Sequence, residues 1–137
     1  AVGLVQMRHL PSAISKRKAC DTLYRDLLAE IAGVVCVEPV GQTLRNYSYF
    51  PVLIDTSSRL SRDELYELLK SEGVYGRRYF YPLISDFPMY KGYPSANPKN
   101  LPVARDISSR VICLPLYPDL PSAEVERICS VMSAGLS

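Results

Sequence analysis

The residues best suited to bind a ligand stand together in residues 76–82, which read Gly-Arg-Arg-Tyr-Phe-Tyr-Pro. Arginine keeps its charge when it is desolvated, and its guanidinium group forms paired hydrogen bonds with phosphates and carboxylates. A tyrosine ring can stack on a sugar or a base, while its hydroxyl group remains available for hydrogen bonding. The run therefore predicts a segment with one end packed in a core and the other facing an anionic or sugar-like ligand.

Four side chains of this run are our candidate binding residues: Arg77, Arg78, Tyr79 and Tyr81. We expect residues 77–81 to form a strand, with Phe80 in the core. Neighbouring side chains of a strand point to opposite faces, so one ligand can contact only one of the two arginines. The alternative is a surface arginine beside an arginine that forms a cross-strand ion pair.

The rest of the sequence contains no recognisable catalytic constellation. It has no glycine-rich phosphate loop, no H-E-x-x-H motif and no nucleophile elbow. Asp63 and Glu64 are explained by the start of a helix, where carboxylates are favourable. We therefore expect no catalytic residue in this chain.

The cysteines do not predict a metal site, because a zinc site needs ligands at short spacing. The chain has one histidine, His9, and four widely separated cysteines: Cys20, Cys36, Cys113 and Cys129. We expect these cysteines to be buried free thiols in the reducing cytoplasm, and we expect no metal ligands.

The composition is that of a single globular domain of 137 residues, with 47% hydrophobic residues and a net charge of +2. So small a charge does not favour nucleic acid as a partner. No apolar run approaches the roughly 20 residues needed to span a bilayer, so we expect no membrane contact.

We call residues 76–82 the binding run. Periodicity and turn residues predict the elements that must position it. Helices are expected at 12–31, 61–73 and 102–109 and from Ser122 onward, and strands at 34–37, 47–54, 77–81 and 111–116. Loops are expected at 39–46 and 82–100. Pro51 lacks a backbone donor, so its strand should lie at a sheet edge or carry a bulge.

This order of elements predicts a two-layer α+β fold, with a small mixed or antiparallel sheet, helices on one face and a long N-terminal helix. We divide the chain into a linking helix region at 1–33 and a small domain at 34–137, which together form one compact unit.

Five blocks of sequence resemble one protein family when they are read in order. They are Asn46–Ile54 (NYSYFPVLI), Ser61–Tyr66 (SRDELY), Arg77–Leu83 (RRYFYPL), Asn100–Ala104 (NLPVA) and Val111–Tyr117 (VICLPLY). Together they resemble the C-terminal small domain of the pyridoxal-phosphate-dependent sugar aminotransferases of the DegT/DnrJ/EryC1/StrS family. Residues 1–7 resemble the helix that follows the cofactor domain in that family.

The resemblance implies a cytoplasmic homodimer with the aspartate aminotransferase type of fold. It implies transfer of an amino group, usually from glutamate, to a keto group on a nucleotide-linked sugar. The Arg-Arg-Tyr-Phe-Tyr-Pro-Leu variant resembles enzymes that aminate dTDP-linked keto-deoxy sugars for surface polysaccharides. Many relatives have histidines where Tyr79 and Ile84 stand here, so no role of those histidines is transferred.

The resemblance also implies that the Schiff-base lysine and the phosphate-binding groups lie upstream of the position that matches Ala1. Schiff-base chemistry requires that amine. We therefore expect a truncated chain that binds no pyridoxal phosphate alone and does not transaminate by itself. The alternative is a freestanding, non-enzymatic binding or oligomerisation module, and in either case we expect self-association.

Overall fold

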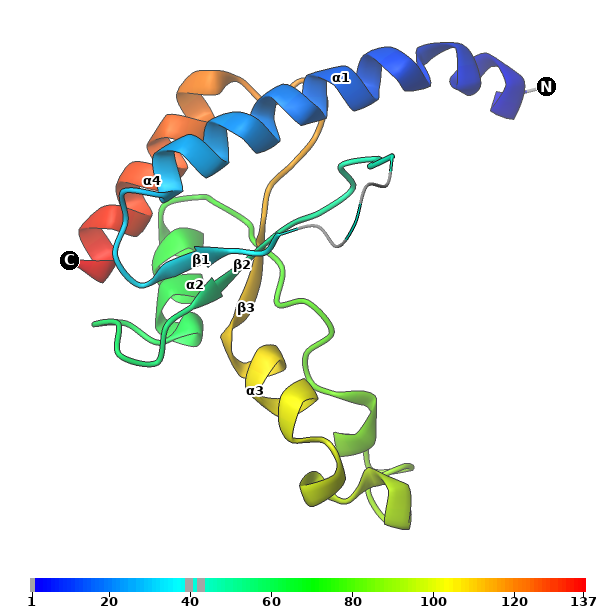
Figure 1. Ribbon diagram of the computed structural model, residues 1–137, viewed down its shortest axis with the longest axis vertical. Coiled ribbons are helices and arrows are strands. Elements are labelled where there is room, and N and C mark those ends of the chain that lie inside the picture. The colour runs from blue at the N-terminus through cyan, green and yellow to red at the C-terminus, as the bar shows by residue number, and fades with distance from the viewer. Residues whose placement is uncertain (1, 39–40, 42–43) are drawn as a thin grey trace.

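Figure 1 shows the computed structural model, which describes residues 2–38, 41 and 44–137. In these residues the α-helices are α1 (Val2–Leu28), α2 (Arg62–Ser71), α3 (Pro102–Arg110) and α4 (Ser122–Leu136). The strands are β1 (Val34–Cys36), β2 (Phe50–Ile54) and β3 (Val111–Leu114). Three single 3₁₀ turns, η1 (Ile84–Asp86), η2 (Pro94–Ala96) and η3 (Pro98–Asn100), precede α3.

The strands form one antiparallel sheet in the order β1-β2-β3. Val34 of β1 lies opposite Ile54 of β2, and Phe50 of β2 lies opposite Leu114 of β3. Helices α1 and α4 pack against each other, and α2 packs against α4, which lies between them (Figure 1). The prediction of a small α+β unit with a long N-terminal helix is confirmed, and the sheet is antiparallel rather than mixed.

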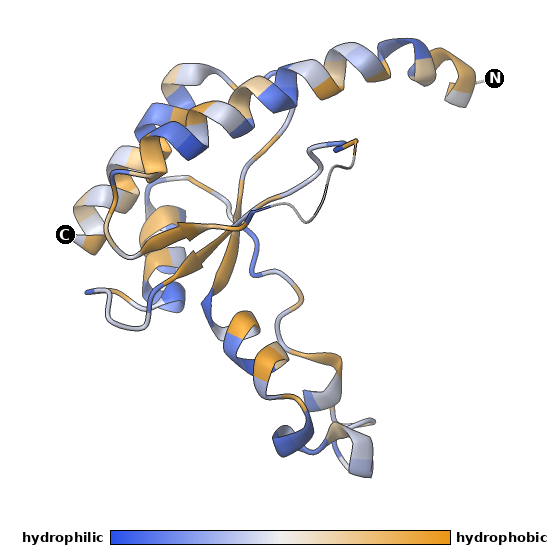
Figure 2. Ribbon diagram, viewed as in Figure 1, coloured by the Kyte–Doolittle hydropathy of each residue, from blue (hydrophilic) through white to orange (hydrophobic). Residues whose placement is uncertain are grey.

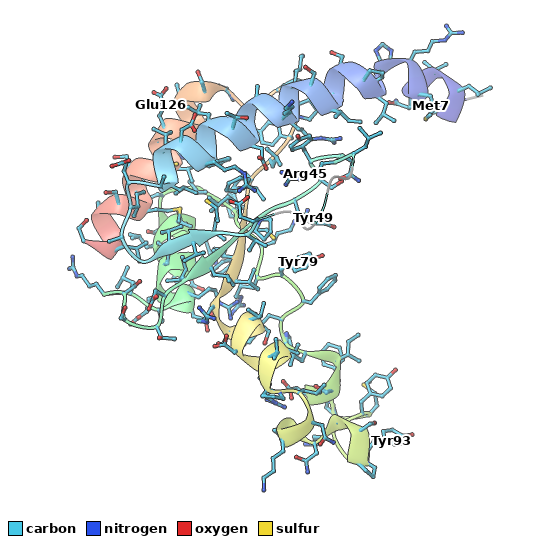
Figure 3. All side chains as sticks on the ribbon, in the orientation of Figure 1. Met7, Arg45, Tyr49, Tyr79, Tyr93 and Glu126 are labelled. Carbon is cyan, nitrogen blue, oxygen red and sulfur yellow. The ribbon has the colours of Figure 1, made fainter. Side chains whose placement is uncertain are left out.

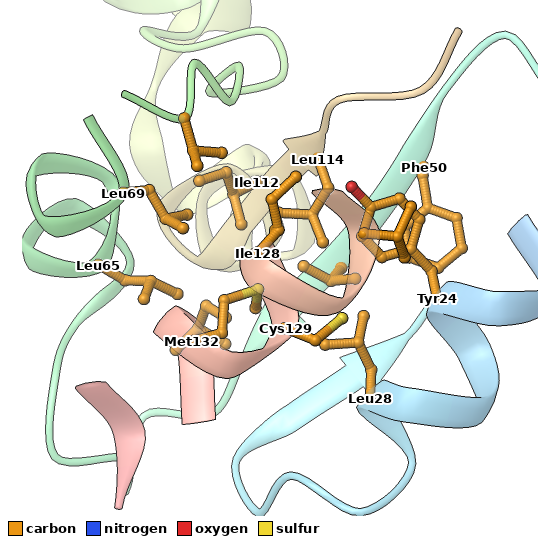
Figure 4. Packing of buried hydrophobic residues seen from close by; sticks show 14 of the residues in the cluster. Tyr24, Leu28, Phe50, Leu65, Leu69, Ile112, Leu114, Ile128, Cys129 and Met132 are labelled. Atoms are coloured by element: carbon orange, nitrogen blue, oxygen red, sulfur yellow. The ribbon is translucent and has the colours of Figure 1, made fainter. Parts of the chain in front are cut away.

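The hydrophobic core lies between the sheet and these three helices (Figure 4). On β2, buried side chains alternate with half-buried ones, as expected of a strand with one face on a core. Figure 2 shows that the three strands are the most hydrophobic part of the molecule. The largest fully buried side chains include Tyr24, Leu28, Phe50, Ile54, Leu65, Leu69, Ile112, Ile128 and Met132.

The prediction that the strand containing Pro51 lies at a sheet edge or carries a bulge is wrong, because β2 is the central strand and pairs with both neighbours in regular register. Pro51 lies opposite Val37, whose N–H donates to the Pro51 carbonyl oxygen at 3.4 Å. A residue other than proline could return a hydrogen bond to the Val37 carbonyl oxygen. Instead, Nη2 of Arg25 on α1 donates to that oxygen at 3.0 Å. The helix thus supplies the donor that proline removes from the strand.

The helix predicted at 12–31 differs at both ends: α1 begins at Val2, ends at Leu28 and contains Pro11. Its second half is anchored in the core by Cys20, Tyr24 and Leu28. Its first half projects beyond the rest of the molecule (Figure 1). The chain turns after Leu28, and Gly33 adopts a left-handed φ of +83° where an added Cβ would lie 2.1 Å from the Ser58 hydroxyl oxygen.

Helix α2 begins and ends as predicted. The Ser61 backbone N–H donates to the Glu64 carboxylate at 2.8 Å, and the Glu64 backbone N–H donates to the Ser61 hydroxyl oxygen at 3.4 Å. At the other end, Gly73 has a φ of +76°, and the N–H groups of Gly73 and Val74 donate to carbonyl oxygens of the last turn. Both ends therefore satisfy backbone groups that a helix leaves without partners.

The predicted strand at 77–81 is wrong except at its first residue, which forms an isolated bridge to β3. The chain leaves the sheet after Arg77, and Phe80 has a left-handed φ of +48°. Phe80 is 72% exposed, so its expected place in the core is also wrong. Local sequence could not reveal this, because the aromatic run has the composition of a strand.

Residues 82–101 form an extension that projects away from the sheet, which we call the arm (Figure 1). The predicted loop proves to be a series of 3₁₀ turns that leads into α3. Ile84, Met89 and Tyr93 on the arm are more than 60% exposed. Residues 39–40 and 42–43 of the other predicted loop lie outside the described residues.

The cysteines are free thiols. Cys20, Cys113 and Cys129 are buried as predicted, whereas Cys36 is only half-buried.

Candidate functional site

A pocket of about 570 Å³ opens where the binding run leaves the sheet. The Arg77 backbone fixes one wall, because its N–H donates to the Cys113 carbonyl oxygen at 2.9 Å and its own carbonyl oxygen accepts from Cys113 at 2.8 Å. The polar and aromatic side chains around the pocket include Tyr49, Tyr75, Arg77, Tyr117 and Glu124.

Arg77 is the charged group in this pocket that is best placed for a ligand. The carboxylate of Glu124 is held by Arg127, at 2.6 Å from Nη2. The Arg77 side chain is exposed, and within the described residues no carboxylate lies within ion-pair distance of it. The pocket therefore combines an available guanidinium group with three tyrosine rings.

Arg78 has different surroundings from Arg77, as expected for two neighbouring side chains, although the segment is not the predicted strand. Its Nη1 lies 3.2 Å from an oxygen of Asp63 on α2. Its guanidinium carbon lies 4.8 Å from the ring centre of Tyr66 and 5.0 Å from that of Tyr81. Arg78 is thus the ion-paired arginine of the alternative interpretation, with its partner on a helix rather than on a strand.

The two candidate tyrosines also lie apart. Tyr79 is half-buried, and its ring centre lies 5.3 Å from that of Tyr49, a pocket residue (Figure 3). Tyr81 is 46% exposed, and its ring contacts the guanidinium groups of Arg62 and Arg78. The candidate residues therefore divide into Arg77 and Tyr79 beside the pocket and Arg78 and Tyr81 beside α2.

Sequence reasoning missed Tyr49, Tyr75 and Tyr117 as pocket residues. Tyr49 and Tyr117 belong to sequence blocks that resemble the family, which was the one available signal. These tyrosines come together around one pocket because of the register between β2 and β3 and the bridge at Arg77. Neither contact can be predicted from a local sequence pattern.

Cys113 does not supply a nucleophile to the pocket. Burial raises the pKa of its thiol to about 11, and the nearby charge of Arg77 only partly opposes that shift. The thiolate is the reactive form of cysteine, so at neutral pH Cys113 remains a protonated, unreactive wall residue.

The residues of the pocket do not fit pyridoxal phosphate as a covalently held cofactor, because no lysine lines it. Lys16 of α1 is paired with Asp119 at 2.8 Å. In the described part of the chain, no group of three or more His, Cys, Asp or Glu side chains is placed to hold a metal ion.

Two polar side chains of the arm are already engaged in contacts within the molecule. Asp86 forms an ion pair with Arg105 of α3, and the Asn97 side chain accepts a hydrogen bond from the Lys99 backbone. These contacts hold the arm together and leave the pocket at Arg77 as the candidate site.

The fold is shared with solved aminotransferases. It superposes on the aminotransferase TlmJ from Streptoalloteichus hindustanus with a TM-score of 0.83 and 28% identity, over 98% of this chain and 35% of that one. Residues 1–133 match the model of the DegT/DnrJ/EryC1/StrS aminotransferase family, and the chain belongs to this family. The family that the five sequence blocks resemble is thus confirmed.

Two curated relatives carry the same name, dTDP-4-amino-4,6-dideoxy-D-glucose transaminase. The relative from Escherichia coli is 48% identical over 132 residues, which are 96% of this chain and 36% of that protein. The relative from Shigella dysenteriae is 41% identical over 133 residues, which are 96% of this chain and 35% of that protein. The chain therefore spans about a third of the length of these relatives. None of the helices in the described part of the chain has both the length and the hydrophobicity of a transmembrane span.

Proposed function

We propose that this chain is the C-terminal portion of a pyridoxal-phosphate-dependent aminotransferase that acts on a dTDP-linked keto-deoxy sugar. The names of the two curated relatives support the substrate class, and family membership supports the cofactor in the longer protein. We propose glutamate as the amino donor, surface polysaccharide synthesis as the purpose and the aspartate aminotransferase type of fold for the whole protein. In this proposal, residues 1–33 link the small domain, residues 34–137, to a cofactor domain.

The observation that carries the proposal is the pocket where Arg77 stands among tyrosines without an acidic partner in the described chain. A guanidinium group in such a place can bind the diphosphate of a nucleotide sugar or the carboxylate of the amino donor. Tyr49 and Tyr79 offer rings on which a sugar or a base can stack. We therefore place Arg77 and Tyr79 at the pocket side of the substrate, and Arg78 and Tyr81 at the side of the substrate next to α2.

No lysine lines the pocket, so the proposal gives the 137-residue chain no transaminase activity of its own. Pyridoxal phosphate would supply the carbonyl and the electron sink for amino transfer when it is bound to the longer protein. The four free cysteines support the cytoplasmic location that we propose.

Replacing Arg77 by alanine in the longer enzyme tests the proposal. We expect kcat/KM for the dTDP-linked keto sugar or for glutamate to fall about 10- to 100-fold, because a hydrogen bond to a charged group contributes about 1.5–3 kcal/mol. Measuring both half-reactions identifies the substrate that Arg77 binds. Arg59→Ala, an exposed arginine away from the pocket, is the matched control. Unchanged kinetics for Arg77→Ala in both half-reactions would exclude Arg77 from the site.

A second candidate function is a non-enzymatic oligomerisation module, and the exposed apolar side chains of α1 favour it. Val2, Leu4, Val5 and Met7 are all more than 50% exposed. Apolar side chains that are exposed in this number on one helical segment favour association. We propose that it contributes to self-association, as in the homodimer that the family resemblance implies.

Sedimentation velocity of the 137-residue chain tests this second candidate. We expect the weight-average sedimentation coefficient to rise with protein concentration, and Leu4→Glu combined with Met7→Glu to suppress the rise. Glu67→Lys, a charge change on the exposed face of α2, is the control. A chain that stays monomeric at every concentration would argue against an oligomerisation module.

A further inference from the structure

The ring of Tyr81 lies against two guanidinium groups, that of Arg62 in the first turn of α2 and that of Arg78 in the binding run. The guanidinium carbon of Arg62 lies 4.7 Å from the ring centre, and that of Arg78 lies 5.0 Å from it. A cation over the face of a tyrosine ring is attracted by the electrons of that ring. With two such contacts, the ring has little freedom to rotate away.

One carboxylate holds both guanidinium groups in place. An oxygen of Asp63 accepts hydrogen bonds from Nε of Arg62 at 2.9 Å and from Nη1 of Arg78 at 3.2 Å. Without this negative charge, two guanidinium groups around one ring would repel each other. Asp63 therefore does more than begin a helix, which was the whole role that the sequence assigned to it.

Arg62 connects this cluster to the rest of the fold. It is only 2% exposed, and its Nη1 donates to the carbonyl oxygens of Ser108 and Val111 at 2.9 and 2.8 Å. These carbonyl groups lie at the end of α3 and the start of β3, where the chain returns from the arm. Its Nη2 has no hydrogen-bond partner among the described residues, and the face of Tyr81 offsets part of that loss.

We propose that Arg62 and Asp63 are positioning residues that fix Tyr81 for substrate binding, an inference that rests on the function proposed above. Tyr81 is joined to the pocket by Tyr79, two residues earlier in the same run. Tyr81 is 46% exposed, so a ligand can reach part of it, while its ring packs against Arg62 of α2. The cluster thus joins the end of the binding run to α2 and, through Arg62, to the start of β3.

The 137-residue chain tests the cluster itself by NMR. We expect Asp63→Asn to shift the Nε–Hε resonances of Arg62 and Arg78 and the ring protons of Tyr81, and Asp63→Glu to restore them in part. Glu67→Gln removes a similar charge from the same helix, away from the cluster, and should leave these resonances unchanged. If Asp63→Asn leaves them unchanged as well, the cluster does not hold Tyr81, and the proposal fails.

The longer enzyme tests the consequence for substrate binding. We expect Asp63→Asn to raise KM for the keto sugar about three- to tenfold, the size of couplings between neighbouring side chains, with kcat unchanged. In a Tyr81→Ala background the same substitution should have no further effect. An equal effect in both backgrounds would mean that Asp63 acts on general stability and would overturn the proposal.

The two proposals can fail separately. If the unaltered longer protein does not aminate a dTDP-linked keto sugar, the proposed function is wrong, and the NMR measurements still decide whether Asp63 and Arg62 fix Tyr81. If that protein is active and Asp63→Asn leaves KM unchanged, only the positioning role is wrong.

Discussion

Tyr24→Ala should lower the free energy of unfolding by about 3–5 kcal/mol, the usual cost of removing a large buried aromatic side chain. Tyr24 is fully buried, and its ring stacks on Phe50 with 4.8 Å between ring centres. Its hydroxyl group also donates to the Pro115 carbonyl oxygen at 3.1 Å, which joins α1 to the segment that lines the pocket. Truncation removes all of these contacts and leaves a cavity in the centre of the core.

Urea denaturation followed by circular dichroism measures this change. Tyr24→Phe separates the two contributions, because it keeps the ring and removes only the donor to Pro115; we expect a loss of about 1–2 kcal/mol. Tyr93→Ala on the arm is the matched control, since that ring is 62% exposed and its loss should change stability little. A midpoint for Tyr24→Ala close to that of the parent chain would contradict the described core.

Arg25→Ala should have the next largest effect, a loss of about 3 kcal/mol, because it breaks a largely buried ion pair. The Asp21 carboxylate is buried, and Nε of Arg25 donates to it at 2.9 Å. Arg45 reaches the same carboxylate at 3.3 Å, so the charge of Asp21 is not left entirely without a partner. The substitution also removes the donor to the Val37 carbonyl oxygen opposite Pro51.

Thermal and urea denaturation of Arg25→Ala measure the loss. Lys16→Ala serves as the control on the same helix: its ion pair with Asp119 is exposed, and exposed pairs contribute about 0–1 kcal/mol. In a Pro51→Val background, residue 51 gains a backbone donor, so the cost of Arg25→Ala should fall by about 1 kcal/mol. An unchanged cost in that background would show that Arg25 does not complete the strand pairing.

The parts of the fold that could be predicted are the elements whose ends are marked by residues of the same local segment. The Ser61 and Glu64 pair and Gly73 define α2 at both ends, and the helix predicted from Ser122 onward is α4. The long N-terminal helix and a small sheet, either mixed or antiparallel, follow from the order of the elements, and only the strand pairing shows that the sheet is antiparallel. The family could be predicted because five separate blocks agree.

The predictions are wrong where a residue far away in the sequence makes a contact that the local sequence pattern does not reveal. Proline normally indicates an edge strand because it lacks a backbone donor. Here Arg25, on another element, supplies the missing donor, so Pro51 can occupy the central strand. The run from Tyr79 to Tyr81 has the composition of a strand, but contacts with α2 and Tyr49 replace strand pairing. Asp63 was understood as a helix start, because the two arginines that it binds could be identified only in three dimensions.

The long helix α1 has two very different environments along its length. From Cys20 to Leu28 it is fastened by buried side chains, whereas Val2 to Leu10 is surrounded by solvent. A helical segment in water depends on its own backbone hydrogen bonds, which are marginal over so few turns. The free end should therefore open and close many times for each opening of the anchored end. A protein surface that covers the free end would reduce this fraying without altering any contact in the sheet.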